Sequence, residues 1–132
     1  MSNPVISGNN VFSHVFIGAA DVAQSSAFYD AALGALGVKN LGPFGSGAVL
    51  YGREKPAFLI GRPGDGEAPS SNGVTIGFAA ATPAEVDAFH AAGLKAGGTD
   101  EGKPGPRGHL PGAYAAYMRD PAGNKICAYT FI

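Results

Sequence analysis

The segment from Asp21 to Leu36 repeats its apolar residues at the spacing of an α-helix. Val22, Phe28 and Ala32 lie on one face when the segment is drawn as a helix, and that face predicts burial against a core. Asp21 is a favourable N-cap, because its carboxylate accepts a hydrogen bond from a free amide of the first turn. Gly37 follows as a typical C-terminal stop, so the pattern predicts one amphipathic helix.

A second segment, TPAEVDAFHAAGLKA, carries a complete signal for the start of a helix. Thr82 is placed to cap it, Pro83 fits the first helical position, and Glu85 completes a capping box. The pair Gly97-Gly98 marks its end. The sequence therefore predicts a second helix of similar length.

Short apolar runs between turn residues predict strands over most of the remaining chain. These runs are Val11–Ile17, Ala48–Gly52, Ala57–Ile60, Val74–Ala79, Ala113–Arg119 and Lys125–Phe131. Two Gly- and Pro-rich stretches, Arg62–Gly73 and Glu101–Pro111, are predicted to be loops.

The two halves of the chain repeat one pattern with a constant offset of 61 residues. Pairs at this offset are His14 and Thr75, Asp21 and Thr82, Ala27 and Ala88, Phe28 and Phe89, Leu33 and Leu94, and Gly37 and Gly98. We predict an α+β fold of two βαβββ modules, residues 10–61 and 73–132, joined by a linker at 62–72. A module this small buries little surface alone, so both are expected to form one domain.

Composition narrows the classes of function. Aromatic residues make up 10% of the 132 residues, which argues against disorder. The net charge is −1 and no basic run occurs, so nucleic acid is not an expected partner. The first ten residues lack the basic and apolar regions of a signal peptide, and no apolar run reaches the length of a membrane span, so we expect neither feature. With Cys127 as its single cysteine, the chain is expected in the reducing cytoplasm.

Two motifs and the repeat together resemble the vicinal oxygen chelate superfamily of glyoxalases, bleomycin-resistance proteins and extradiol dioxygenases. The motifs are SHVFIGAADVAQSSAFYDAALGALG, which contains His14, and PGPRGHLPGAYAAYMRDPAGNKICAY, which is similar to lactoylglutathione-lyase-like members. The resemblance implies a cup-shaped, eight-stranded mixed sheet with the helices on its convex side. It also implies a homodimer, because members of this family generally pair.

In metal-dependent members of that family, four side chains facing into the cup hold a divalent metal. The resemblance places these positions at His14, Leu59, Thr75 and Cys127. Only His14 is an ordinary ligand, since Leu59 has no donor atom, Thr75 is a poor donor and Cys127 would have to ionise. We therefore predict no metal site and no cofactor.

Strand alternation predicts which side chains line the cup. If His14 faces inward, then Phe12 and Phe16 do so too, and Tyr129 shares a face with Cys127. The predicted ligand-binding residues are Phe12, His14, Phe16, Leu59, Thr75, Arg107, His109, Cys127 and Tyr129. Such a lining suits an apolar or aromatic small molecule.

His14 and Cys127 are the candidate catalytic residues. His14 could be a metal ligand, a proton donor to a bound molecule, or a buried histidine bonded to backbone. Cys127 could be a small buried apolar residue, or could form a thiolate–imidazolium pair or a soft-metal site with His14. Arg107 is a candidate for binding a carboxylate, and His109 lies in a loop expected near the mouth of the cup.

Two functions remain open from the sequence. A third alternative is that the protein is a member of the family whose functional site has decayed. One is a metal-free, small-molecule-binding protein of the bleomycin-resistance type. The other is a glyoxalase-like lyase or isomerase that uses a divalent metal on a small carbonyl compound or thiol conjugate. Leu59, Thr75 and Cys127 at the metal positions favour the first.

Overall fold

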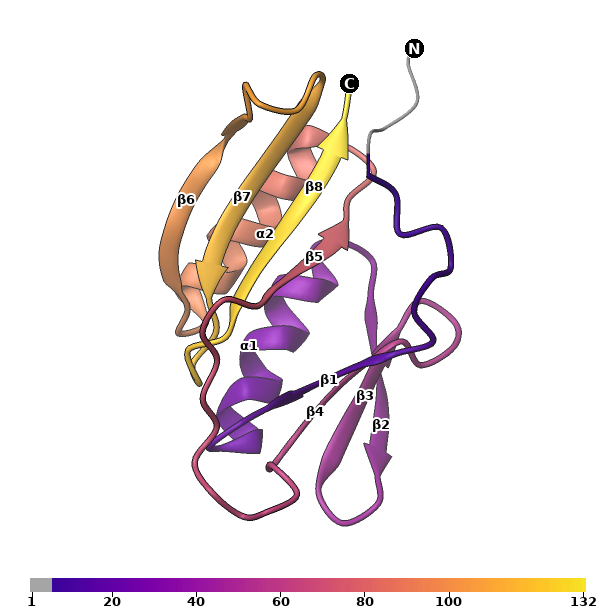
Figure 1. Cartoon of the computed structure of the whole chain (residues 1–132), viewed down its shortest axis with the longest axis vertical. Coiled ribbons are helices and arrows are strands. Elements are labelled where there is room, and N and C mark those ends of the chain that lie inside the picture. The colour runs from indigo at the N-terminus through magenta and orange to yellow at the C-terminus, as the bar shows by residue number, and fades with distance from the viewer. Residues whose placement is uncertain (1–5) are drawn as a thin grey trace.

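The computed structural model describes residues 6–132, which fold into two βαβββ modules (Figure 1). The first module contains β1 (Val15–Gly18), α1 (Val22–Gly34), β2 (Lys39–Phe44), β3 (Ala48–Gly52) and β4 (Phe58–Gly61). The second contains β5 (Thr75–Ala79), α2 (Pro83–Lys95), β6 (Thr99–Pro106), β7 (Ala113–Arg119) and β8 (Lys125–Phe131). The predicted α+β class and its two modules are confirmed.

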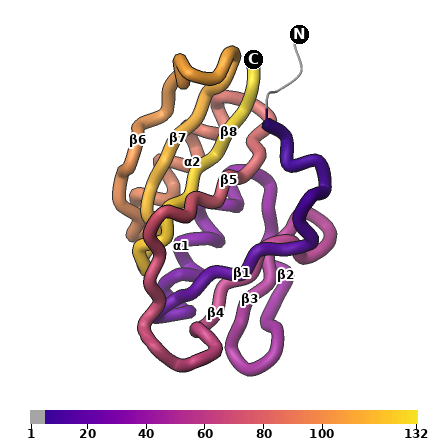
Figure 2. The backbone as a smooth tube through the Cα atoms, in the orientation of Figure 1, coloured from indigo at the N-terminus to yellow at the C-terminus, as the bar shows by residue number. Residues whose placement is uncertain are grey.

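Each module has its own four-stranded mixed sheet. The strand orders are β1-β4-β3-β2 and β5-β8-β7-β6, so both sheets have the same topology. In each, the first strand pairs in parallel with the last, and the other pairs are antiparallel. The eight strands are thus divided between two sheets, and the segment from Arg62 to Gly73 connects the two sheets without forming a strand (Figure 2).

Both helices begin and end where the sequence predicts. The Asp21 carboxylate accepts a hydrogen bond from the Gln24 amide at 3.0 Å, and Thr82 Oγ1 accepts one from the Glu85 amide at 3.2 Å. Gly37 and Gly97 have φ values of +78° and +106°, a left-handed conformation that glycine adopts without strain. Neither helix within residues 6–132 has the length and hydropathy needed to cross a membrane.

The strand predictions need three corrections. The first strand spans only Val15–Gly18, so residues 11–14, which include Phe12 and His14, precede it instead of lying in it. Strands β2 and β6 were not predicted, and part of the predicted loop Glu101–Pro111 belongs to β6. Both are polar edge strands with irregular register, held by backbone hydrogen bonds to β3 and β7. Strands that are held mainly by backbone hydrogen bonds need no alternation of apolar residues, so the sequence pattern did not indicate β2 and β6.

The two modules share one hydrophobic core. Helix α1 packs on α2, and Phe28 of α1 lies in a socket beside Gly93 of α2 and Gly98. A Cβ atom on Gly98 would lie 2.6 Å from the Phe28 ring, and one on Gly93 would lie 2.2 Å from the Met118 side chain. At Gly98 a Cβ would also lie 2.9 Å from the Gly93 carbonyl oxygen, so a larger residue does not fit there, whereas at Gly93 the flexible Met118 side chain would have to move.

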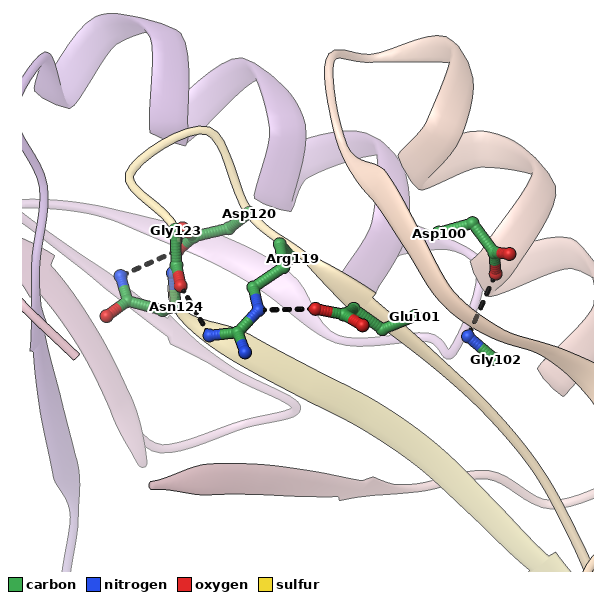
Figure 3. A network of polar contacts seen from close by, with 7 residues as sticks. All are labelled: Asp100, Glu101, Gly102, Arg119, Asp120, Gly123 and Asn124. Carbon is green, nitrogen blue, oxygen red and sulfur yellow. Dashed lines mark hydrogen bonds and ion pairs between the residues drawn. The ribbon is translucent and has the colours of Figure 1, made fainter. Parts of the chain in front are cut away.

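Polar contacts also join the modules. The Tyr29 hydroxyl of α1 donates to the Asp120 carboxylate in the β7–β8 turn at 2.6 Å. The Asn124 side-chain amide donates to the Gly18 carbonyl at the end of β1, at 2.8 Å. Figure 3 shows Asn124 bonded to Asp120, so the turn is fixed from within as well as from the first module.

Candidate functional site

Each sheet has one face covered by its helix and one face free of helices. On β8, Ile126 and Ala128 point into the core, whereas Cys127, Tyr129 and Phe131 alternate to the other face. On β7, Tyr114 packs toward α2 and donates to Asp87, and Tyr117 lies on the helix-free face. The alternation predicted for β8 is confirmed.

A pocket of about 540 Å³ lies on the helix-free side of the first sheet. His14, Phe16 and Leu59 line it, together with the β2–β3 turn and the start of the linker. Phe16 and Leu59 are register partners on β1 and β4. His14 is exposed, and its Nδ1 lies 3.0 Å from Ser13 Oγ. His14 is therefore not a buried histidine bonded to backbone.

A second pocket of about 540 Å³ lies on the helix-free side of the second sheet. It brings together three predicted site residues from distant segments, Thr75, Arg107 and His109. Lys103, Tyr117 and Lys125 also line it, and sequence reasoning did not assign these three to the site. Alternation from Cys127 would have placed Lys125 on this face. Lys103 carried no such signal, because β6 was not predicted.

Cys127 is buried in a cluster with Tyr117 and Tyr129. The two tyrosine hydroxyls are hydrogen-bonded, and their rings meet edge to face with centroids 5.9 Å apart. Burial, the dominant cause, raises the pKa of the Cys127 thiol to about 11. Cys127 is therefore a neutral thiol at neutral pH and a weak nucleophile.

The structure does not bring His14 and Cys127 together as a hydrogen-bonded pair. His14 lies beside the first sheet with Ser13 as its partner, whereas Cys127 lies within the second sheet between β5 and β7. Phe12 is 74% exposed and lines neither of the two 540 Å³ pockets. Tyr129 lines a third pocket, of about 450 Å³, with Phe131 and residues 6–8.

The four positions implied to bind metal do not form a donor set suited to a divalent ion. Leu59 offers no donor, Thr75 a neutral hydroxyl, and Cys127 a thiol whose raised pKa disfavours the thiolate. Within residues 6–132, no three His, Cys, Asp or Glu side chains are grouped closely enough to hold a metal. The donor chemistry therefore does not fit the metal that the family resemblance implies.

One further pocket, of about 690 Å³, lies at the junction of the modules and contains none of the predicted site residues. Arg53 lines it, but its guanidinium donates to the carbonyls of Leu36 and Ala79, one in each module. Phe58 and Phe78 meet edge to face there, 5.0 Å apart. These contacts give the region a structural role in joining the modules.

A sequence model of the Glyoxalase/Bleomycin resistance protein/Dioxygenase superfamily matches residues 11–128. The chain belongs to this superfamily. A crystal structure of a glyoxalase/bleomycin resistance protein from Albidiferax ferrireducens T118 is 47% identical, with a TM-score of 0.79. That alignment covers 89% of this chain and 96% of the other.

More distant members of the superfamily share the fold. A glyoxalase/bleomycin resistance protein/dioxygenase family enzyme from Burkholderia phytofirmans PsJN is 19% identical over 91% of this chain and 98% of its own, with a TM-score of 0.72. A lactoylglutathione lyase from Agrobacterium tumefaciens is 20% identical over 93% and 95%, with a TM-score of 0.63. No curated protein matches the chain. At such identities the superfamily fold is shared, but the activity has to be argued from the site.

Proposed function

We propose that the protein binds an apolar or aromatic small molecule on the helix-free faces of its sheets and needs no metal to do so. One observation carries this proposal: of the four positions implied to bind metal, only His14 is an ordinary ligand. The surroundings of these positions support it, because Phe16 and Leu59 line the first pocket and Tyr117 lines the second. Apolar and aromatic walls with a few polar groups are typical of small-molecule sites.

His14 and Cys127 take different parts in this proposal. The exposed imidazole of His14 uses Nδ1 toward Ser13 and leaves Nε2 available for a hydrogen bond with a polar atom of the bound molecule. Cys127, buried and neutral, belongs to the wall behind Tyr117 and Tyr129. A single buried cysteine also suits a reducing compartment, and we propose the cytoplasm.

Ligand classes are compared by thermal shift. Aromatic and apolar compounds should raise the melting temperature, because a ligand that binds only the folded state stabilises it by mass action. Nucleotides and sugar phosphates should not, since the sequence has no glycine-rich phosphate loop. Stabilisation by the phosphorylated compounds, with none by the aromatic ones, would contradict the proposal.

The competing function, a metal-dependent lyase or isomerase, is tested by metal analysis of the purified protein. We expect less than one equivalent of Zn, Ni, Co or Mn, and no glyoxalase activity when these ions are added. The reason is that a Lewis-acid site needs about three protein ligands. Stoichiometric metal in the wild type that is lost in His14→Ala would reject the metal-free proposal.

A further inference from the structure

Positive charge is concentrated at the pocket of the second sheet. Lys103, Arg107 and Lys125 line it, three of the nine lysine and arginine residues in the chain. They come from β6, from the residue after it and from the start of β8. We call this group, with the Tyr117 ring that it surrounds, the cationic pocket.

Within residues 6–132, none of these three cations forms an ion pair. Glu101 is the one carboxylate that lines the pocket, and it pairs with Arg119 at 2.7 Å instead (Figure 3). The ion pairs formed within residues 6–132 are this one and the His90–Asp100 pair. Neither involves Lys103, Arg107 or Lys125, so the concave surface carries three cations against the single carboxylate of Glu101, and this excess of like charge costs free energy.

Two of the three cations, Arg107 and Lys125, are held in place by the Tyr117 ring or by the backbone. Arg107 Cζ and Lys125 Nζ each lie 5.4 Å from the ring centroid, within the range of cation–π attraction. Arg107 also donates to the Lys103 carbonyl at 2.9 Å. Gly102 leaves room for this arrangement, because a Cβ there would lie 3.3 Å from the guanidinium. The charges of Arg107 and Lys125 are therefore positioned before any ligand arrives.

We propose that the cationic pocket binds the carboxylate of a small organic molecule, whose apolar part lies against Tyr117. This inference rests on the proposed function and adds an anionic group to the ligand. The Lys103 and Lys125 ammonium groups supply charge-assisted hydrogen bonds, and Thr75 and His109 lie beside them. A carboxylate is favoured over a phosphate because the pocket is lined by strands and a loop, with no helix N-terminus.

The test is calorimetric titration with three probes that share a phenyl group: phenylacetate, phenylacetamide and phenyl phosphate. Phenylacetate should bind most tightly, and its affinity should fall as salt is added. If phenylacetamide binds as tightly as phenylacetate, the carboxylate inference is wrong, although aromatic binding stands. If none of the probes binds, both proposals fail. Tighter binding of phenyl phosphate would overturn the choice of a carboxylate.

Substitutions of the lysines test whether phenylacetate binds in the cationic pocket. Lys103→Gln and Lys125→Gln should each weaken phenylacetate binding about tenfold, because each removes one charge-assisted hydrogen bond. They should leave phenylacetamide binding unchanged. Lys39→Gln is the matched control, with the same change of charge on an exposed residue of the first sheet, and should stay within about twofold. An equal loss in the control would show a general charge effect and would overturn the assignment.

Discussion

Asp120 is the residue at which three parts of the chain meet. Its buried carboxylate accepts hydrogen bonds from the Tyr29 hydroxyl, from the backbone amides of Ala122 and Asn124, and from the Asn124 side chain. Asn124 in turn donates to Gly18. A buried carboxylate with four donors is fully compensated for its loss of water, so this network stabilises the turn and the contact between modules together.

We expect Tyr29→Phe to lower the free energy of unfolding by about 1–2 kcal/mol, since a buried hydrogen bond to a charged group is lost. Tyr114→Phe is the matched control, because its hydroxyl donates to Asp87 at the same 2.6 Å but at an exposed site. It should cost less than about 0.5 kcal/mol. Urea denaturation measures the free energy of unfolding of both variants. Equal losses would show that the buried network stabilises the fold no more than the exposed hydrogen bond does.

Cys127 gives the fold a dependence on alkaline pH. Burial raises the pKa of the folded-state thiol to about 11 from an ordinary value of 9.0. The folded state therefore favours the neutral thiol, and the stability this provides is complete below pH 9 and lost as the pH rises toward 11. Across that window the wild type should lose about 2 kcal/mol more than Cys127→Ala. Denaturation curves that run parallel over this range would contradict this expectation.

At the scale of elements, the sequence predicts helices better than strands in this fold. A helix carries its signals locally, in Asp21 and Thr82 at the starts and in Gly37 and Gly97 at the ends, and all four act as predicted. Strands β2 and β6 carry no such signal, because each is held by backbone bonds to a neighbour. The predicted strand before α1 is longer than β1 because Val11 and Phe12 are apolar, as strand residues often are, although both are exposed in the structure.

The site residues also differ in whether a local signal in the sequence predicts their position. The side of β8 on which Cys127 and Tyr129 lie follows from alternation alone, and so the sequence was sufficient there. The cationic pocket depends on β6 bringing Lys103 beside Lys125, residues that are far apart in the chain. Such proximity depends on tertiary pairing, which the residues of a single sequence do not reveal.

The N-cap of α2 allows a test of how much a local helix signal contributes to stability. Thr82 accepts from the Glu85 amide in the first turn, and the Glu85 carboxylate accepts at 2.9 Å from the amide of Ala81, which precedes the cap. We expect Thr82→Ala to cost about 1 kcal/mol of stability. Thr82→Ser keeps the oxygen and should cost only a few tenths. Thermal melts of the two variants should differ, and identical melts would refute a role for the hydroxyl.

At the scale of the molecule, large apolar side chains of the first module are open to solvent. Phe12, Phe16 and Phe44 are 74%, 48% and 59% exposed, and Phe16 and Phe44 line the same pocket. Edge strands and apolar faces of this kind are usually covered by a partner. A homodimer, which the sequence also led us to expect, would cover them with a second copy of the chain.

Light scattering at micromolar concentration should therefore give the mass of two chains. Phe12→Asp with Phe44→Asp should shift the mass toward one chain, because charge on a buried apolar contact is costly. Leu94→Asp is the control, on an exposed position of α2, and should leave the mass unchanged. A monomeric wild type would reject the prediction.

The socket for Phe28 means that the two halves of the chain are not interchangeable. At the repeat offset, Gly93 corresponds to Ala32 and Gly98 to Gly37, so the first half carries a methyl group where the second has none. In a chain joined from two copies of the first half, that methyl group would crowd the phenylalanine, because a Cβ at the position of Gly93 would lie 3.2 Å from the Phe28 ring. The two halves share one topology, but their packing surfaces differ. A substitution that is tolerated in one half is therefore not necessarily tolerated at the matching position of the other.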